Sequence, residues 1–246
     1  PQHTIRLYFN QPPPPGLFPA NEHLEQRVIP FPRLWTHLRL GWELQQNPPD
    51  LFFTPAHVIP WSYHGASAAT IHDLGYHHFP EAHPRRQLAY LRWSTRHNGR
   101  RSRLVIADSE ATKTDLVELD GVDAAKIAVI YPGIDPQLQP VTDENTLTRV
   151  WAKYGIKPPY FIFLSTLQPR KNLVRLLQAF AAADLPHQLV LAGRRGWLAE
   201  PILAAHAALP TAVRRRVLLP GYIPDTDKAP LLSGAAALVY PSLYEG

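Results

Sequence analysis

The sequence predicts an α/β protein whose strands form parallel sheets. Short apolar runs alternate with helical segments along most of the 246 residues, which is the pattern of a parallel sheet covered by helices. One run, Tyr160–Leu164, is apolar throughout and is typical of a buried strand. Polar residues and glycines gather where the expected strands end, as is usual beside the ligand crevice of an open α/β sheet.

The first half contains two clear helix signals among its strands. One helix should begin at Pro84, a favourable first-turn residue, and run to about His97. Another should start after Ser109, a typical N-cap, and end near Gly121, a typical C-cap. The expected strands are Thr4–Phe9, Arg27–Ile29, Leu51–Thr54, Ala68–Ile71, Leu104–Ala107 and Ile127–Tyr131.

The alternation stops in the middle of the chain and then restarts. Pro132-Gly133 interrupts it, and residues 136–159 hold one short helix, around Leu147–Tyr154. The later elements are strand Tyr160–Leu164, helix Asn172–Ala183, strand Gln188–Ala192, helix Pro201–Ala208, strand Arg216–Leu219, helix Asp227–Ser233 and strand Ala236–Val239. We therefore expect one domain at 1–135, a crossing segment at 136–159 and a second domain at 160–246.

Composition sets limits on the kind of protein. The content of 45% hydrophobic and 18% charged residues is ordinary for a globular chain that can hold two small domains. No apolar run approaches the roughly 20 residues that cross a bilayer, and no signal peptide opens the chain, so we expect a cytoplasmic protein. The absence of Cys excludes disulfides and thiolate metal sites. The absence of Met, with a strand-like run near each end, leads us to expect a piece cut from a longer protein.

Positive charge is concentrated in the second half. Residues 1–135 hold 13 Lys and Arg against 13 Asp and Glu, whereas residues 136–246 hold 12 against 7, which accounts for the whole net charge of +5. An anion-binding domain is therefore expected in the second half. Two further arginine groups are either solvated faces or surfaces that lean on anionic lipid or an acidic acceptor. They are Arg92, Arg96, Arg100, Arg101 and Arg103, and Arg214–Arg216.

The most informative stretch is the loop Leu167–Asn172, which contains Arg170 and Lys171. It follows a buried strand and precedes a helix, whose first turn offers unpaired backbone N–H groups and the positive end of the helix dipole. Two cations at such a position suit a phosphate or a diphosphate. A solvated basic loop is the alternative.

Several motifs occur in a fixed order along the chain. They are Thr70–Leu74, Ile106–Ser109, Val129–Asp135, Leu167–Leu173, Leu189–Gly193, Gly221–Asp225 and Val239–Gly246. Over Ala68–Gly246 the chain resembles the retaining glycosyltransferases of family 4, the group 1 set; before about Leu51 it matches only in outline. The resemblance implies a GT-B fold, in which two Rossmann-like domains face across a cleft. The first would lie on the acceptor side, and the second, incomplete here, would bind the nucleotide sugar.

The resemblance also assigns roles to residues. Arg170 and Lys171 would grip the diphosphate of a GDP- or UDP-linked sugar and stabilise the charge that grows as the glycosidic bond breaks. Glu245 would be the first residue of the family's Glu-x7-Glu motif and would accept hydrogen bonds from sugar hydroxyls, unless it is a surface residue in a turn. His72 would be a catalytic contact near the sugar, unless it only ends its own strand and bonds Asp73.

Other positions would lie around the nucleotide. Gly193 should allow close approach of the backbone, and Ile223 would offer main-chain groups to the base. Tyr244 belongs to the same motif as Glu245. Ser165 and Thr166 stand where many family members have Gly-Arg, so Arg170 would supply the missing cation.

One motif points to a different fold. Asp225-Thr226-Asp227 is an Asp-x-Asp sequence, which binds a metal in GT-A glycosyltransferases, but here it follows a turn and opens a helix. We expect these carboxylates to serve at the helix N-cap and first turn, and we expect no metal and no cofactor. Ten of the twelve His lie at or before His97, in loops without paired helical spacing, so we expect them to be solvated rather than ligands.

The sequence therefore predicts a metal-independent, retaining glycosyltransferase acting on a nucleotide sugar and a glycan or lipid-linked acceptor. Peripheral contact with an anionic membrane is an open possibility, and no nucleic-acid partner is expected. Two rival classes remain: a non-catalytic nucleotide or nucleic-acid binding protein, and a GT-B-fold enzyme of different chemistry such as a sugar-nucleotide epimerase.

Overall fold

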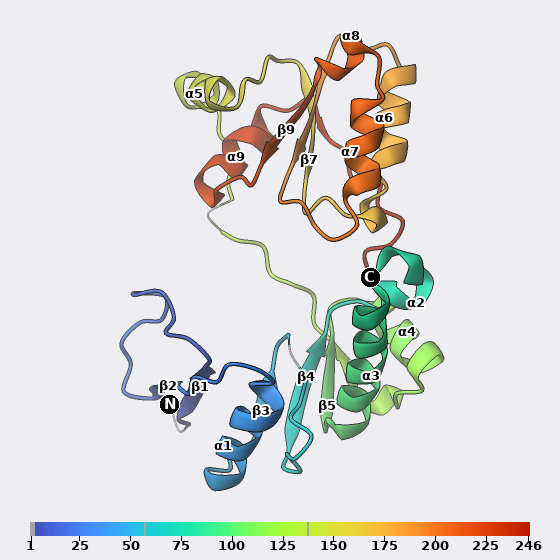
Figure 1. Cartoon of the computed structure of the whole chain (residues 1–246). Helices are drawn as coiled ribbons and strands as arrows, with labels where there is room; N and C mark the ends of the chain where they lie inside the picture. Colours follow the sequence, from blue (N-terminus) through green and yellow to red (C-terminus); the bar gives the residue numbers. More distant parts are fainter. Residues whose placement is uncertain (1–2, 57, 137) are drawn as a thin grey trace. The chain divides into compact units, whose positions relative to one another are not determined.

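The computed structural model describes residues 3–56, 58–136 and 138–246 of the chain (Figure 1). Its contacts divide the chain into two compact units. The first unit holds the described residues up to Leu74, together with Tyr90–Tyr131 and Gly246, and the second holds Gly75–Ala89 and Pro132–Glu245. The domain limits expected from the sequence stay a prediction. His57 and Gln137, which fall within the expected first domain and crossing segment, lie outside the described residues.

The sheets of the first unit are entirely parallel. A four-stranded sheet has the order β3-β4-β5-β6, and a separate two-stranded sheet pairs β1 with β2. The strands are β1 (Ile5–Phe9), β2 (Leu24–Val28), β3 (Phe52–Thr54), β4 (Ser67–Ile71), β5 (Leu104–Ala107) and β6 (Ile127–Val129). Since Ile71 pairs with Ala107, β4 and β5 end side by side, and the residues that follow them meet at one edge of the sheet.

Two helices carry this unit's clearest local signals. Helix α4 (Glu110–Asp120) begins where the Ser109 side chain accepts a hydrogen bond from the Thr112 N–H, and it ends at Gly121 in the left-handed conformation. Both predicted caps are confirmed. Helix α3 (Arg85–Arg101) is one turn longer than expected. A π-helix at Thr36–Leu40 continues into α1 (Gly41–Gln46), and neither was predicted.

The second unit is built on a parallel sheet of order β10-β7-β8-β9. Its strands are β7 (Tyr160–Leu164), β8 (Gln188–Ala192), β9 (Val217–Gly221) and β10 (Ala237–Leu238). Its helices are α2 (Gly75–His78), α5 (Glu144–Tyr154), α6 (Leu173–Ala182), α7 (Glu200–Ala207), α8 (Thr211–Arg214) and α9 (Asp225–Ser233). The predicted α/β class with parallel sheets is confirmed.

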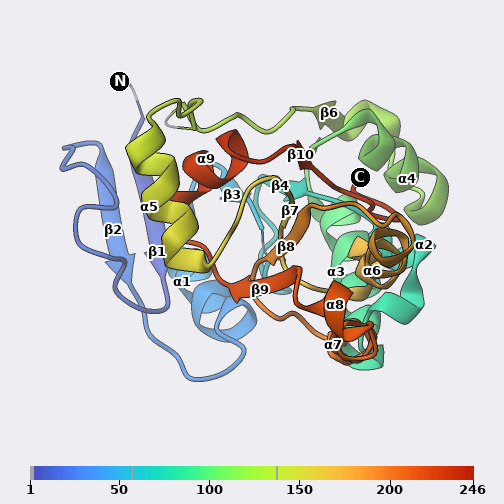
Figure 2. The same cartoon turned by 90° about the horizontal axis from the view of Figure 1, so that it is seen from above.

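Alternate residues of β7 and β8 are buried on the two faces of this sheet. Phe163 and Leu191 pack in one core with helices α6 and α7, whereas Ile162 and Val190 pack in another with α5 and α9. Successive side chains of a strand point to opposite faces, so both faces must be covered by helices. Helices α6 and α7 lie side by side in Figure 1, and α5 lies beside α9, as Figure 2 also shows.

Several predicted boundaries differ from the structure. The strand expected at Ile127–Tyr131 stops at Val129, and Ile130 and Tyr131 are exposed. The helix expected from Asn172 begins at Leu173, because Asn172 has a φ of 58° and joins it to a 3-10 turn at Pro169–Lys171. Arg170 and Lys171 therefore lie in that turn, just before α6.

The segment that follows His72-Asp73 in sequence packs within the second unit. It forms α2 and a 3-10 turn at Pro80–Ala82. The indole N–H of Trp197 donates to the carbonyl of Ala82 at 2.7 Å, and the ring of His78 stacks on Tyr244 at a centroid distance of 4.6 Å. None of the helices described is both long and apolar enough to span a bilayer.

Candidate functional site

Lys171 and Glu245 meet at the carboxyl end of β7, although they lie far apart in the sequence. The Lys171 ammonium is 2.7 Å from each carboxylate oxygen of Glu245 and 3.3 Å from the hydroxyl of Tyr240. An ammonium has three N–H donors, and these three acceptors take them all. The side chain of Lys171 is only 5% exposed, whereas that of Glu245 is 41% exposed. The site therefore holds a buried cation beneath a carboxylate that solvent can reach.

Arg170 fixes the chain segment that carries Glu245. Its guanidinium donates to the Tyr244 carbonyl at 2.6 Å and lies 3.6 Å from a Glu245 oxygen. The backbone N–H of Leu243 donates to the Arg170 carbonyl at 2.9 Å, and the Asn172 side chain donates to the Pro241 carbonyl at 3.1 Å. Four neighbouring contacts of Arg170 and Asn172 thus join the end of the Pro169–Lys171 turn to the segment after β10.

The charge state of Glu245 follows from these contacts. Burial raises the pKa of Glu245, but hydrogen bonds from Lys171 and Ser242 and the charges of Lys171 and Arg170 outweigh it and hold the pKa below its ordinary value of 4.5. Glu245 is therefore an ionised hydrogen-bond acceptor at neutral pH. A carboxylate in this state can accept from the hydroxyl groups of a sugar.

Gly193 brings the ends of three strands close together. Its N–H donates to the Gly221 carbonyl at 2.8 Å, and its φ is +147°. A Cβ atom at this position would lie 1.8 Å from the carbonyl oxygen of Ser165, so only glycine fits. Ser165 in turn donates its N–H to the Ala192 carbonyl at 3.0 Å. This close approach is between strand ends of the protein itself, and the approach of a nucleotide to Gly193 stays a prediction.

Ile223, Thr166 and Tyr244 lie in the second unit with Gly193. The side chain of Ile223 is 2% exposed and packs in the core between the sheet and α5 and α9. Only its main chain can therefore serve a ligand. Thr166 and Tyr244 are partly buried. Thr166 lies beside Gly196, and Tyr244 stacks on His78.

His72 lies in the first unit, directly after β4. Its Nδ1 is 2.7 Å from a carboxylate oxygen of Asp108, which directly follows β5, and its side chain is 57% exposed. The Thr112 hydroxyl donates to the His72 carbonyl at 3.0 Å. The sequence alternative named Asp73 as the partner of the ring, whereas the structure gives Asp108. The paired ends of β4 and β5 explain this, because they place residues 72 and 108 side by side.

Two of the site's neighbours were missed by sequence reasoning. Tyr240 accepts from Lys171 and also lies under its ammonium, 5.0 Å from ring centroid to Nζ. Asp108 lies in the motif Ile106–Ser109, but the sequence did not pair it with His72. Aligning the ends of the two neighbouring parallel strands would have placed Asp108 beside His72. Nothing in the sequence indicated Tyr240 beyond its place in the last motif.

The Asp-x-Asp motif has a structural use. The cap at the start of α9 is Pro224, without a side-chain hydrogen bond, so the predicted N-cap role of aspartate is wrong, although Asp225 and Asp227 do lie in the first turn. Asp227 accepts hydrogen bonds from Lys153 at 2.6 Å and from the Tyr154 hydroxyl at 2.5 Å, which joins α9 to α5. Within the described ranges, no three His, Cys, Asp or Glu side chains come together as a metal site would require.

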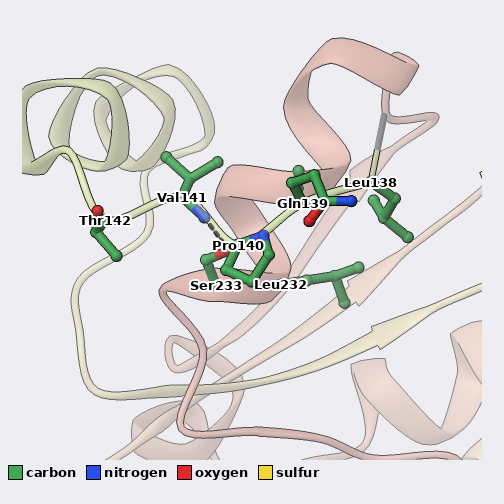
Figure 3. Close-up of a pocket in the computed structure, with 8 residues that line it drawn as sticks. Leu138, Gln139, Pro140, Val141, Thr142, Leu232 and Ser233 are labelled. Atoms are coloured by element: carbon green, nitrogen blue, oxygen red, sulfur yellow. Dashed lines mark hydrogen bonds between the residues drawn. The ribbon is translucent and has the colours of Figure 1, made fainter. Parts of the chain in front are cut away.

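A cavity of about 370 Å³ lies elsewhere in the second unit (Figure 3). It lies between the segment Leu138–Thr142 and helix α9, where Ser233 accepts a hydrogen bond from the Val141 N–H at 2.9 Å. Leu138, Val141, Ala229 and Leu232 make it largely apolar, and it contains none of the predicted site residues. It is not the candidate site.

Comparison with known families matches both parts of the chain. Residues 3–138 match the description Glycosyltransferase Family 4, and residues 150–246 match glycosyl transferases group 1. The chain belongs to this family. The first match covers more than half of the sequence, including the opening segment that resembled the family only in outline.

A curated relative carries a more specific name. Over 221 residues the chain is 27% identical to the O-antigen chain mannosyltransferase B of Escherichia coli, covering 87% of this chain and 56% of that protein. The chain thus spans little more than half the length of this relative.

Solved structures share the fold. The chain superposes on Anabaena HepE in complex with UDP-glucose with a TM-score of 0.68 at 20% identity, covering 89% of this chain and 61% of HepE. It superposes on WaaG, a glycosyltransferase involved in lipopolysaccharide biosynthesis, with a TM-score of 0.66 at 18% identity, covering 98% and 67%. Both are GT-B glycosyltransferases, and at these identities the likeness establishes the fold alone.

Proposed function

We propose that this chain is part of a retaining glycosyltransferase that moves a sugar from a nucleotide-diphosphate sugar to a glycan or lipid-linked acceptor. Family membership supports the reaction class. The name of the mannosyltransferase relative and the UDP-glucose bound to HepE support a GDP- or UDP-linked donor. The observation that carries the proposal is the contact of Arg170 and Lys171 with Glu245 at the carboxyl edge of the β7 sheet.

The donor would enter this site by an exchange of ionic partners. Before the donor binds, Glu245 compensates the buried ammonium of Lys171, which would otherwise be an unpaired buried charge. The diphosphate takes over the Lys171 and Arg170 contacts, and the freed Glu245 carboxylate turns to the hydroxyls of the donor sugar. The same cations then stabilise the negative charge that develops on the leaving diphosphate.

His72 would serve as a contact to the reacting sugar, and Asp108 as its positioning residue. The hydrogen bond from His72 Nδ1 to Asp108 fixes which ring nitrogen faces the carboxylate, so Nε2 is left to face a substrate. We propose no metal and no other cofactor, since two cations already neutralise the diphosphate.

The acceptor would be presented at an anionic membrane surface on the cytoplasmic side. The support is the group of arginines on and after α3, but two of its members have internal partners. Arg96 bonds Asp120 at 2.9 Å and Arg101 donates to the Tyr63 carbonyl at 2.7 Å. Arg100 and Arg103 are exposed and would supply the lipid contact.

The proposal is tested by replacing Lys171 in the protein that carries this chain. Nucleotide sugars are first screened for transfer by mass spectrometry. With the active donor, Lys171→Ala should lower turnover by roughly tenfold to a few hundredfold, because a charge-assisted contact to the transition state is lost. Lys157→Ala, which removes an exposed lysine from the same unit, should leave turnover unchanged.

Each other outcome points to a different reading. Unchanged turnover of Lys171→Ala at saturating donor removes the assignment of the cation pair. Conversion of the donor sugar without transfer to an acceptor would favour an epimerase. Nucleotide or oligonucleotide binding without any turnover would favour a binding protein.

A further inference from the structure

A histidine that the sequence did not assign to the site lies against the segment that carries Glu245. His78 is the last residue of α2, and its ring stacks on that of Tyr244 with a centroid distance of 4.6 Å and an interplanar angle of 22°. Tyr244 directly precedes Glu245 in the chain. His78 is exposed and Tyr244 is partly buried, so the stack lies at the surface beside the candidate site. Aromatic pairs at this distance attract each other, so each ring helps to fix the other.

The segment that carries His78 is itself anchored in the second unit. The Trp197 indole N–H donates to the Ala82 carbonyl at 2.7 Å, and the ring centroids of His83 and Trp197 are 5.7 Å apart. Ala82 is only 4% exposed, and Trp197 lies in the loop that follows β8. His78 therefore belongs to a chain segment with a fixed backbone, and it can hold the Tyr244 ring in place.

The proposed exchange of ionic partners removes other contacts of Tyr244 and Glu245. In the structure, Arg170 donates to the Tyr244 carbonyl at 2.6 Å, and Lys171 donates to both Glu245 oxygens at 2.7 Å. Under the proposed function the diphosphate takes over both cations, so these contacts are lost when the donor binds. The ring stack uses none of these atoms and persists. Glu245 would then face the sugar from a segment that His78 still holds.

We propose that His78 is a positioning residue for Glu245 in the donor-bound site, and that it acts through the stack on Tyr244. This rests on the proposed function, because it concerns the step in which Glu245 turns to the sugar hydroxyls. The backbone hydrogen bond from Leu243 to Arg170 also persists, but it precedes Tyr244 and does not fix the rotation of the residues after it. Loss of the stack should therefore affect the sugar end of the donor and leave the diphosphate end unchanged.

The test separates the two ends of the donor in the protein that carries this chain. The kcat with the active donor is measured together with the binding of its free nucleotide, UDP or GDP, by isothermal titration calorimetry. His78→Ala should lower kcat by about threefold to tenfold, the range of one aromatic pair, and should leave nucleotide binding unchanged. His78→Phe keeps a ring for the stack and should retain the wild-type kcat. His3→Ala, which removes an exposed histidine from the first unit, is the matched control.

A double-mutant cycle tests whether His78 acts through Tyr244. Tyr244→Ala alone should lower kcat at least as much as His78→Ala does. The variant with both changes should lose no more than Tyr244→Ala, since the two changes remove the same stack. Losses that multiply would give His78 a separate contact and overturn the positioning role.

The remaining outcomes distinguish this inference from the proposed function. If the wild-type protein transfers no sugar from any nucleotide sugar, the proposed function fails and the inference with it. If the wild type is active and His78→Ala has the kcat of His3→Ala, the inference alone is overturned. Equal weakening of nucleotide binding and kcat by His78→Ala also overturns it, because the change would then disturb the diphosphate end. Equal losses in His78→Ala and His78→Phe overturn it too, since the imidazole itself would then be required.

Discussion

Gly193 is the residue whose identity the structure restricts most sharply. Its φ of +147° is available to glycine and strained for other residues, and a Cβ would meet the backbone oxygen of Ser165 at 1.8 Å. That oxygen belongs to the main chain of the neighbouring strand's end, so it cannot turn away as a side chain could. The close approach of three strand ends therefore depends on this one position.

Gly193→Ala should lower the free energy of unfolding by at least about 2 kcal/mol, because backbone strain and a steric clash add together. The measurement is urea unfolding at neutral pH. Gly133→Ala is the matched control in the same unit, since no atom lies within 4 Å of the position that its Cβ would take. If the two variants prove equally stable, the clash at Gly193 is relieved by a small shift and glycine is not required.

At the site, sequence reasoning found the charges but not their pairing. Arg170 and Lys171 were identified from the strand and helix around them, and Glu245 from its motif. The three hydrogen bonds of Lys171 to Glu245 and Tyr240 could not be predicted, because these partners lie in a segment some 70 positions later in the sequence. Such contacts depend on the sheet order β10-β7, which places the end of the chain beside the first strand of the unit.

At the scale of elements, α5 and α9 are joined by a buried carboxylate. Asp227 is 8% exposed and accepts from Lys153 and Tyr154 through one oxygen. Burial raises the pKa of Asp227, but the two hydrogen bonds and the Lys153 charge outweigh it, so the pKa lies below its ordinary value of 3.8. The carboxylate is thus stabilised in its charged form by folding.

Asp227→Asn should lower the free energy of unfolding at pH 7 by about 1–3 kcal/mol, since hydrogen bonds to a charged group are lost. Because the folded pKa is depressed, this advantage of the wild type is complete above about pH 4 and disappears as the pH falls through the folded pKa. Urea unfolding at several pH values measures it.

The control lies two residues away in the same motif. Asp225 pairs with Lys228 at 2.6 Å, but its side chain is 79% exposed, so Asp225→Asn should change stability little at any pH. An equal loss in the two variants, or a difference independent of pH, would show that the Asp227 contacts do not stabilise the α5–α9 pair. A stabilisation of wild type by Mn²⁺ that both variants lose would instead support the metal reading of Asp-x-Asp.

Elements with strong local signals were predicted best. Ser109 and Gly121 define the ends of α4. The Ser109 side chain accepts a hydrogen bond from a first-turn N–H, and Gly121 takes the left-handed conformation in which its N–H reaches a carbonyl of the last turn. The helical stretch from Thr36 to Gln46 was missed because Gly41 in its middle is typical of a helix break. In the structure that glycine is closely packed, since a Cβ would lie 3.2 Å from Pro60 and 2.7 Å from the Ser62 hydroxyl, which would have to rotate away.

At the scale of the whole molecule, the uneven charge separates the candidate functions. Residues 136–246 carry 12 Lys and Arg against 7 Asp and Glu, yet the candidate site uses few of these cations. A nucleotide held by two cations loses few counterions on binding, whereas a nucleic acid contacts many. The net positive charge therefore predicts different salt dependences for the two ligands.

Binding of UDP should weaken by less than about tenfold between 50 and 200 mM salt, as expected for two cationic contacts. Binding of a single-stranded oligonucleotide through the wider basic surface would fall far more steeply. Titration of both ligands across this range checks the prediction. A shallow salt dependence for a tightly bound oligonucleotide, together with no UDP binding, would contradict the glycosyltransferase assignment.

The pairing of Lys171 with Glu245 has a consequence for how tightly any donor can be held. The carboxylate is an intramolecular competitor of the phosphate, because the fold holds both of its oxygens 2.7 Å from the ammonium. Under the proposed function, the free energy of donor binding therefore reflects the difference between two contacts of Lys171, the one gained with the diphosphate and the one lost with Glu245. Free phosphate should therefore bind more weakly than the donor. It would have to displace Glu245 from Lys171, and it offers the displaced carboxylate no sugar hydroxyls with which to form new hydrogen bonds.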